Sequence, residues 1–205
     1  MLMYLQAKII KTQMHRFLDF NAYDVVVWLD ATVSIVGPNT AQHMLQLVDA
    51  GRNFITFEHE PSRMGRVSAE VEASHFPRYT ETSEVFGAAQ DIGNQYVQYL
   101  DEGFTEKWWL GEYDAPMGIK DRPQYGMWVT CFVAYDTKSP KTTSFLNAWW
   151  TEIVKRTTQD QVSFPFVAWK QKVYPFSLPA NSSGVVVNGN SDRNDLYSKL
   201  SHGNR

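Results

Sequence analysis

The sequence contains only one cysteine and no long apolar run, and both shortages narrow the class of protein. The lone Cys131 cannot form an internal disulfide, and a zinc site made of four thiolates is impossible. No segment approaches the roughly 20 apolar residues that cross a membrane. Lys8, Lys11 and Arg16 also interrupt residues 1–20, where a signal peptide would be apolar. We therefore expect a soluble, cytoplasmic protein without a membrane span.

An excess of positive charge is also lacking. The 205 residues include 19 Lys and Arg against 22 Asp and Glu, a formal net charge of −3, and no basic block stands out. Proteins that bind nucleic acids neutralise phosphates with clustered Lys and Arg, so we expect no nucleic-acid partner. Hydrophobic residues make up 43% of the chain, which is enough apolar surface to bury a core and argues against general disorder.

The short motifs of several common enzyme classes are missing as well. The chain contains no Gly-x-Gly-x-x-Gly, no Walker sequence, no Gly-x-Ser-x-Gly and no His-Glu-x-x-His. These absences count against dinucleotide oxidoreductases, P-loop enzymes, esterases of the nucleophile-elbow type and the common zinc proteases.

Apolar periodicity predicts helices that alternate with buried strands. The helices are expected over residues 4–20, 41–50, 67–76, 85–100, 142–156 and 162–170, and the strands over residues 23–31, 53–57, 126–135 and 185–187. Thr142 or Thr143 would cap the fifth helix, and Pro165 would lie in the first turn of the sixth. The alternation predicts a single α/β domain over residues 1–190, with helices flanking a mixed sheet, and a polar tail over residues 191–205.

The first strand ends in a carboxylate that is a candidate ligand-binding group. Residues 23–31 form a β-branched apolar run without alternation, which predicts a central strand covered on both faces. Ligands of open α/β sheets bind beyond the carboxyl ends of the strands, where Asp30 would lie. Asp30 would either hold a divalent cation or a sugar hydroxyl, or cap the turn that follows the strand.

Two further polar segments follow predicted elements. Residues 58–60 (Glu-His-Glu), with Arg63 nearby, would bind metal or diphosphate, or form a solvated loop. Residues 159–161 (Gln-Asp-Gln) precede a helix, so Asp160 would either contact a ligand or act as an N-cap.

The aromatic residues and the cysteine are mostly expected in the core. Residues 105–123 combine aromatic residues with Gly and Pro, which predicts an irregular loop. Trp109 in this loop is a candidate for stacking on a sugar face. Cys131 lies within a predicted strand, which favours a small core residue over a nucleophile.

Several segments, taken in order, carry a resemblance to a known family. They are a basic helix from Lys8-Ile9-Ile10-Lys11 to His15-Arg16-Phe17-Leu18, Tyr23-Asp24-Val25-Val26-Val27-Trp28-Leu29-Asp30, His59-Glu60-Pro61-Ser62-Arg63, the helix with Glu70 and Glu72, Trp149-Trp150-Thr151-Glu152-Ile153, and Thr158-Gln159-Asp160-Gln161-Val162-Ser163-Phe164. The ordered set resembles glycosyltransferase-like domains of the GT-A fold, which are known from plant, bacterial and viral proteins and were long catalogued as a domain of unknown function. The match covers residues 4–170 and lacks the strand, helix and strand with which GT-A domains open, so an N-terminally shortened GT-A-like sheet is expected.

The resemblance implies transfer of a sugar from a nucleotide-sugar donor to a glycan or protein-linked acceptor. A divalent cation, Mn²⁺ or Mg²⁺, would bridge the donor diphosphate and Asp30, with His202 as a ligand from near the C-terminus. GT-A enzymes usually present an Asp-x-Asp pair at this point, whereas this chain reads Asp30-Ala31-Thr32 and offers one carboxylate.

The resemblance also assigns roles to other residues. Asp160 and Gln161 would be catalytic and hold sugar hydroxyls, Lys8, Lys11 and Arg63 would lie near the phosphates, and His59, Glu72 and Trp109 would bind substrate.

Two alternative functions and one prediction of oligomeric state stand beside this hypothesis. The first is a non-catalytic carbohydrate-binding or assembly protein on a degenerate transferase scaffold. The second, a hydrolase that uses Glu58 and Glu60, has no supporting spacing. A sheet without its usual first strands would expose an edge, which predicts a homodimer.

Overall fold

The computed structural model describes residues 2–31, 33–35, 39–59, 61–75, 80–82, 89–109, 125–178 and 197–199. The predicted strand over residues 185–187, most of the aromatic loop, Pro77 and His202 lie outside these residues. Within them, no helix is long and apolar enough to cross a membrane.

The centre of the fold is a four-stranded mixed sheet in the order β1-β4-β3-β5. Its strands are β1 (Val25–Leu29), β3 (Phe54–Glu58), β4 (Trp128–Asp136) and β5 (Phe176–Leu178). Strand β4 pairs antiparallel with β1 and β3, and β5 pairs parallel with β3. A separate antiparallel pair joins β2 (Val33–Ile35) to β6 (Tyr197–Lys199). The mixed α/β class is confirmed, whereas β2, β5 and β6 were not predicted, because three residues carry too little periodicity.

Strand β1 lies at an edge of the described four-stranded sheet, so its prediction as a central strand was wrong. The buried central strands are β3 and β4. The predicted cover on both faces of β1 is found, because its side chains pack against both cores, which explains the lack of alternation. Each of its five residues is half-buried. Dimerisation through an exposed edge stays a prediction.

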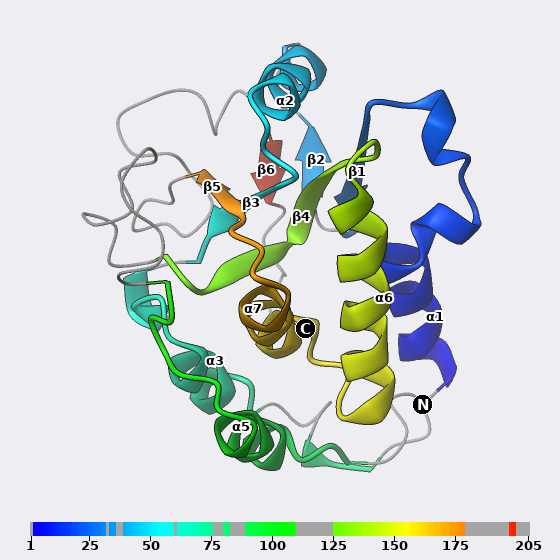
Figure 1. Cartoon of the computed structure of the whole chain (residues 1–205). Helices are drawn as coiled ribbons and strands as arrows, with labels where there is room; N and C mark the ends of the chain where they lie inside the picture. Colours follow the sequence, from blue (N-terminus) through cyan, green and yellow to red (C-terminus); the bar gives the residue numbers. More distant parts are fainter. Residues whose placement is uncertain are drawn as a thin grey trace.

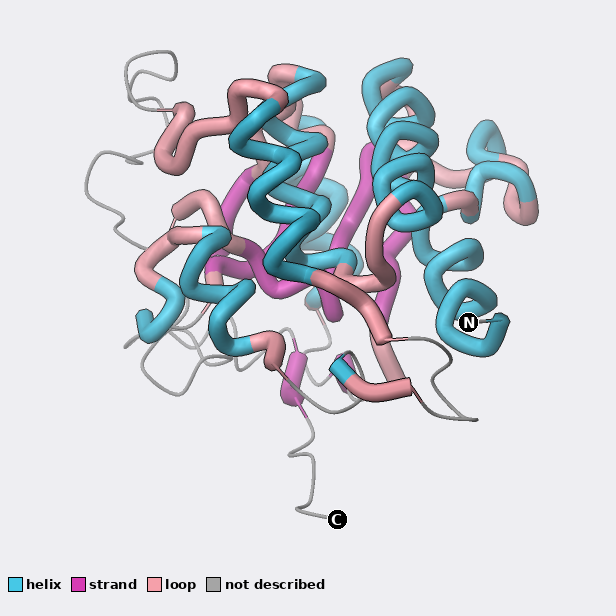
Figure 2. Tube along the Cα trace, turned by 90° about the horizontal axis from the view of Figure 1, so that it is seen from below, coloured by secondary structure: helices cyan, strands magenta, loops and turns pink. Residues whose placement is uncertain are grey.

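Helices lie on both sides of this sheet. They are α1 (Leu2–Thr12), α2 (Thr40–Asp49), α3 (Val67–Ala73), α5 (Ile92–Asp101), α6 (Pro140–Lys155) and α7 (Asp160–Gln171). Helix α2 lies on one side, and α1, α6 and α7 lie on the other with α3 and α5 beside them (Figure 1). Seen from below, the helices of this larger layer stand in front of the strands (Figure 2). The sheet therefore separates two cores.

The first helix ends earlier than predicted. Short 3-10 turns over Met14–Arg16 and Phe20–Ala22 replace its second half. The Thr12 hydroxyl donates to the Lys8 carbonyl at 2.7 Å, a bond of the kind that bends helices. The Gln13 amide donates to the Leu146 carbonyl of α6 at 3.2 Å, which directs the chain toward α6 instead of along the helix axis.

Side-chain caps decide where α5 and α6 begin. Helix α5 starts at Ile92 rather than near residue 85, because Asp91 accepts from the Asn94 N–H. Helix α6 starts at Pro140 under a Ser139 cap, so the prediction of a cap at Thr142 or Thr143 was wrong. Pro140 occupies the first turn, where proline needs no hydrogen-bond partner for its nitrogen.

Helix α7 begins at Asp160, so Pro165 lies inside the helix and not in its first turn as predicted. Proline has no N–H to donate to the carbonyl four residues earlier, which is that of Gln161. The helix continues because seven consecutive residues, Val162–Ala168, are buried. Packing on both sides outweighs the local cost of the proline.

The two cores differ in size. The larger one holds aromatic residues of β4, α6 and α7, among them Trp128, Tyr135, Phe145, Trp149 and Phe164. The smaller one lies under α2 and includes Met44, Ile55, Phe57 and Cys131. Cys131 is buried in β4, which confirms its prediction as a core residue.

Gly126, just before β4, is a sensitive point of this packing. Its φ is +110°, and an added Cβ would lie 2.0 Å from a Trp109 ring atom and 2.8 Å from the Gly65 carbonyl oxygen. Gly126→Ala should lower the free energy of unfolding by about 2–4 kcal/mol in urea titrations. Gly51 has a φ of +81° with nothing within 4 Å, so Gly51→Ala should cost only about 1 kcal/mol. Equal losses for both variants would contradict the steric explanation.

Candidate functional site

Polar side chains gather at one edge of the sheet. Because β1 and β3 are both antiparallel to β4, their carboxyl ends and the start of β4 lie at the same edge. Asp30 follows β1, His59 follows β3, and Thr130 lies near the start of β4. The first turn of α7, with Asp160, meets this edge through a hydrogen bond from Thr130.

Asp160 is bound by two lysines of α1. Lys8 Nζ lies 2.5 Å from Asp160 Oδ1, and Lys11 Nζ lies 2.5 Å from Oδ2. The Thr130 hydroxyl donates to Oδ2 at 3.1 Å. Asp160 is only 3% exposed. Helices α1 and α7 are thus joined by a buried ionic contact between residues about 150 positions apart in sequence.

Lys11 also reaches the carboxylate at the end of β1. Its Nζ lies 3.5 Å from Asp30 Oδ1, which accepts from the Trp28 indole N–H at 2.5 Å. The ammonium lies 5.9 Å and 5.5 Å from the ring centroids of Trp28 and Trp149. Lys8, Lys11, Asp30 and Asp160 form what we call the Lys–Asp cluster. Its formal charges sum to zero.

The charges of this cluster hold Asp160 ionised. Burial by itself raises the pKa of Asp160, but the Lys11 and Lys8 ammonium groups and their hydrogen bonds outweigh it and hold the pKa far below its usual range. Burial, and then the charges of Asp160 and Asp30, raise the pKa of the Tyr135 hydroxyl well above its usual value. Asp160 is therefore a very weak base, and Tyr135 stays protonated.

A second group forms around the buried Glu70 carboxylate. Arg63 Nε donates to Glu70 Oε2 at 2.7 Å, and His59 Nε2 lies 3.6 Å from the same oxygen. The amides of Gln159 and Gln161 donate to Glu70 Oε1 at 3.2 and 3.5 Å. We call His59, Arg63, Glu70, Gln159 and Gln161 the Glu70 cluster.

Residues 159–161 connect the two clusters. The side chain of Asp160 points to the lysines of α1, while Gln159 and Gln161 on either side of it point to Glu70 of α3. Gln159 is the N-cap residue and lies outside the helical backbone of α7, so its amide can reach Glu70 together with that of Gln161. The start of α7 therefore fixes α1, α3 and the sheet edge relative to one another.

The structure brings together most of the predicted site residues. Asp30, Asp160, Lys8 and Lys11 lie in the Lys–Asp cluster, and His59, Arg63 and Gln161 lie in the Glu70 cluster. Glu70 belonged to the resemblance but was not predicted as a site residue. The sequence feature that could have pointed to Glu70 is its position in the same predicted helix as Glu72.

Two predicted substrate-binding residues lie elsewhere. Glu72 is exposed on α3, outside the Glu70 cluster. Trp109 is 4% exposed, and its ring packs against Tyr125 and Trp108. The expectation of an exposed Trp109 was wrong, because the indole fills the core beside Gly126. His202 lies outside the described residues.

The described residues do not fit a divalent cation at Asp30. Manganese and magnesium ions are held by several oxygen ligands, and a neighbouring positive charge weakens their binding. The Lys11 ammonium already lies 3.5 Å from Asp30 Oδ1. Among the residues that the structure describes, no three His, Cys, Asp or Glu side chains form a group that could hold a metal ion.

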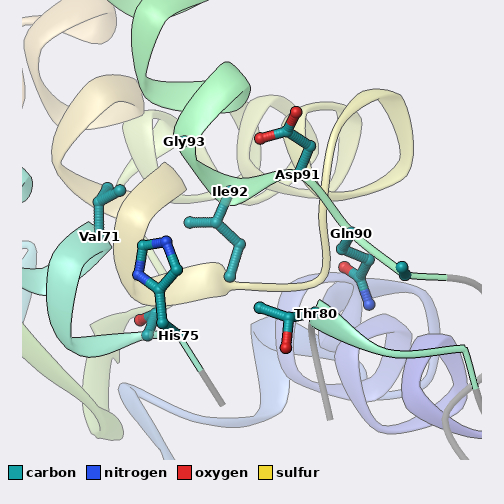
Figure 3. Close-up of a pocket in the computed structure, with 9 residues that line it drawn as sticks. Val71, His75, Thr80, Gln90, Asp91, Ile92 and Gly93 are labelled. Carbon is teal, nitrogen blue, oxygen red and sulfur yellow. The ribbon is translucent and has the colours of Figure 1, made fainter. Parts of the chain in front are cut away.

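A pocket of about 330 Å³ lies beside the Glu70 cluster, between the end of α3 and the start of α5. The side chains of His75, Ile92 and Thr80 point toward one another across it (Figure 3). Two residues that line the pocket form hydrogen bonds with the segment before α7. Ser74 Oγ accepts from the Gln159 amide at 2.6 Å, and Gln90 Oε1 accepts from the Thr158 N–H at 2.6 Å. The pocket and the clusters thus share a wall.

Asp160→Asn should destabilise the fold at neutral pH by about 3–5 kcal/mol, because it leaves two lysines without their anion. The folded pKa of Asp160 is lowered, so its contribution is complete above the unfolded pKa of about 3.9 and is lost as the pH falls further. Urea titrations at decreasing pH should therefore show the gap between wild type and variant shrinking below about pH 4. The exposed Asp49→Asn is the control and should show no such gap. A gap for Asp160→Asn that stays constant with pH would contradict this assignment.

Comparisons with protein-family models, with curated proteins and with solved structures found no match to this chain. The function of the two clusters is therefore inferred from their residues and geometry.

Proposed function

We propose that the chain is a glycosyltransferase that moves a sugar from a nucleotide-sugar donor to a glycan or protein-linked acceptor. The observation that carries the proposal is the meeting of both clusters at residues 159–161, beyond the carboxyl ends of β1 and β3. Five of the segments that resemble GT-A transferases contribute residues to these two clusters, although the segments are far apart in sequence. Such a concentration of buried charge at a sheet edge is typical of functional sites.

Basic side chains that are partly exposed would contact the donor diphosphate. The side chains of Lys8, His59 and Arg63 are 16%, 14% and 20% exposed, so an anion can approach them while their carboxylate partners stay buried. Departure of a nucleoside diphosphate builds negative charge on the leaving oxygens, and fixed positive groups stabilise it. These side chains are already oriented by Asp160 and Glu70, so binding requires little reordering.

Asp160 acts in this proposal as a positioning residue and not as the general base. Each of its carboxylate oxygens already accepts from an ammonium, and its lowered pKa makes it a poor proton acceptor. Gln161, which is half-buried, has an amide that would reach a sugar hydroxyl while it contacts Glu70. The acceptor side would be the neighbouring pocket, where His75 and Thr80 offer polar atoms beside the apolar Val71 and Ile92.

A second candidate function is a non-catalytic carbohydrate-binding protein on a transferase scaffold. The observation that favours it is the engagement of both Asp160 oxygens and of Asp30 Oδ1 in buried or half-buried contacts. Such a protein would bind saccharides without cleaving a donor.

The experiment that separates the two functions is an assay of nucleoside diphosphate release. The chain is incubated with UDP- and GDP-sugars, with and without simple saccharide acceptors, and release is measured by chromatography together with donor affinity by calorimetry. A transferase should bind at least one donor and release its diphosphate faster with an acceptor. Saccharide binding without donor binding or release would support the second function and overturn the first.

Glu70 and Glu72 provide a matched pair of variants on α3. Glu70→Gln should weaken donor binding by about tenfold or more, because His59 and Arg63 lose the carboxylate that orients them. Glu72→Gln should leave donor affinity unchanged, because Glu72 is exposed outside the cluster. Calorimetric titration with the best donor, at a temperature where both variants are folded, gives the comparison. Equal affinities of the two variants would show that the Glu70 cluster takes no part in donor binding.

A further inference from the structure

The Lys11 ammonium has the surroundings of a bound cation. It is 1% exposed and lies between two carboxylates, 2.5 Å from Asp160 Oδ2 and 3.5 Å from Asp30 Oδ1. The rings of Trp28 and Trp149 add two π faces at 5.9 and 5.5 Å. Burying a lysine without such partners is costly.

We propose that the side chain of Lys11 occupies the cation position beside Asp30, so that this site works without a divalent metal ion. The inference goes beyond the proposed function, because it concerns the charge at this position and holds whether or not a donor is bound. It replaces the expectation, implied by the resemblance, that Asp30 binds Mn²⁺ or Mg²⁺.

The charge balance of the Lys–Asp cluster supports the proposal. Two ammonium groups face two carboxylates, so the cluster is neutral without a metal ion. A divalent cation bound to Asp30, whose side chain is 39% exposed, would share that carboxylate with the buried Lys11 ammonium, and the repulsion between the two positive charges would weaken its binding. The ammonium therefore competes with a metal ion for Asp30.

Oxygen atoms surround the position of the ammonium. Besides the two carboxylates there is the Thr130 hydroxyl, which contacts Asp160 Oδ2 at 3.1 Å. The Tyr135 hydroxyl is fully buried and has no hydrogen-bond partner among the residues that the structure describes, and the charges of Asp160 and Asp30 both act on it. Carboxylate and hydroxyl oxygens are ligands that Mg²⁺ and Mn²⁺ prefer. Removal of the Lys11 ammonium would thus leave a set of oxygens suited to a hard cation.

The test is a titration with Mn²⁺ alone, followed by electron paramagnetic resonance of the free ion, on wild type, Asp30→Asn, Lys11→Ala and the double variant Lys11→Ala/Asp30→Asn. Wild type and Asp30→Asn should bind Mn²⁺ equally weakly. Lys11→Ala should bind it about tenfold or more tightly than wild type, and Asp30→Asn in that background should remove the gain.

Two results would overturn the proposal. One is Mn²⁺ binding by the wild type that Asp30→Asn abolishes, and the other is a folded Lys11→Ala variant with no gain. If Lys11→Ala does not fold, the comparison of wild type with Asp30→Asn decides alone. The titration uses no nucleotide, so its outcome is independent of whether the chain proves to be a glycosyltransferase.

Discussion

Burial of the Asp160 carboxylate is the constraint on which the rest of the site depends. A carboxylate that is 3% exposed is tolerated only with charged partners, and two lysines on successive turns of α1 supply them. This requirement fixes α1 against the start of α7, and Thr130 adds the sheet to the same contact. The sheet edge, two helices and the strand-end Asp30 therefore take their places around one ionised group.

The Glu70 cluster repeats this arrangement with other partners. Here one buried carboxylate collects a guanidinium, an imidazole and two amides. In both clusters, basic side chains are held by a buried carboxylate and are partly exposed to solvent. Such preorganised groups can stabilise developing negative charge without the cost of reorientation. Asp160 and Glu70 are buried, whereas Lys8, His59 and Arg63 are partly exposed. We therefore distinguish the carboxylates, which position other groups, from the basic side chains, which would touch a ligand.

Much of the site could be predicted from the sequence, because polar residues at the ends of apolar runs are visible without a structure. Asp30, His59 and Asp160 were found in this way. The prediction of Glu72 rather than Glu70 as a site residue shows what a sequence pattern cannot resolve. The two residues are two positions apart, so they lie about 200° apart around α3, and only the contacts of the helix decide which one faces inward. The burial of Trp109 likewise depends on Tyr125 and Gly126, which lie beyond the other end of the predicted loop.

The sequence by itself determined the mixed α/β class, the main strands and the identity of most residues with functional chemistry, since these follow from local periodicity and residue type. Only the tertiary structure decided which of those residues contact one another. Lys11 and Asp160 are 149 positions apart, and no spacing rule relates them. Their contact exists because α1 and α7 pack on the same face of the sheet, where the low dielectric makes ionic partners necessary. The same packing turned a candidate metal ligand, Asp30, into the partner of a lysine.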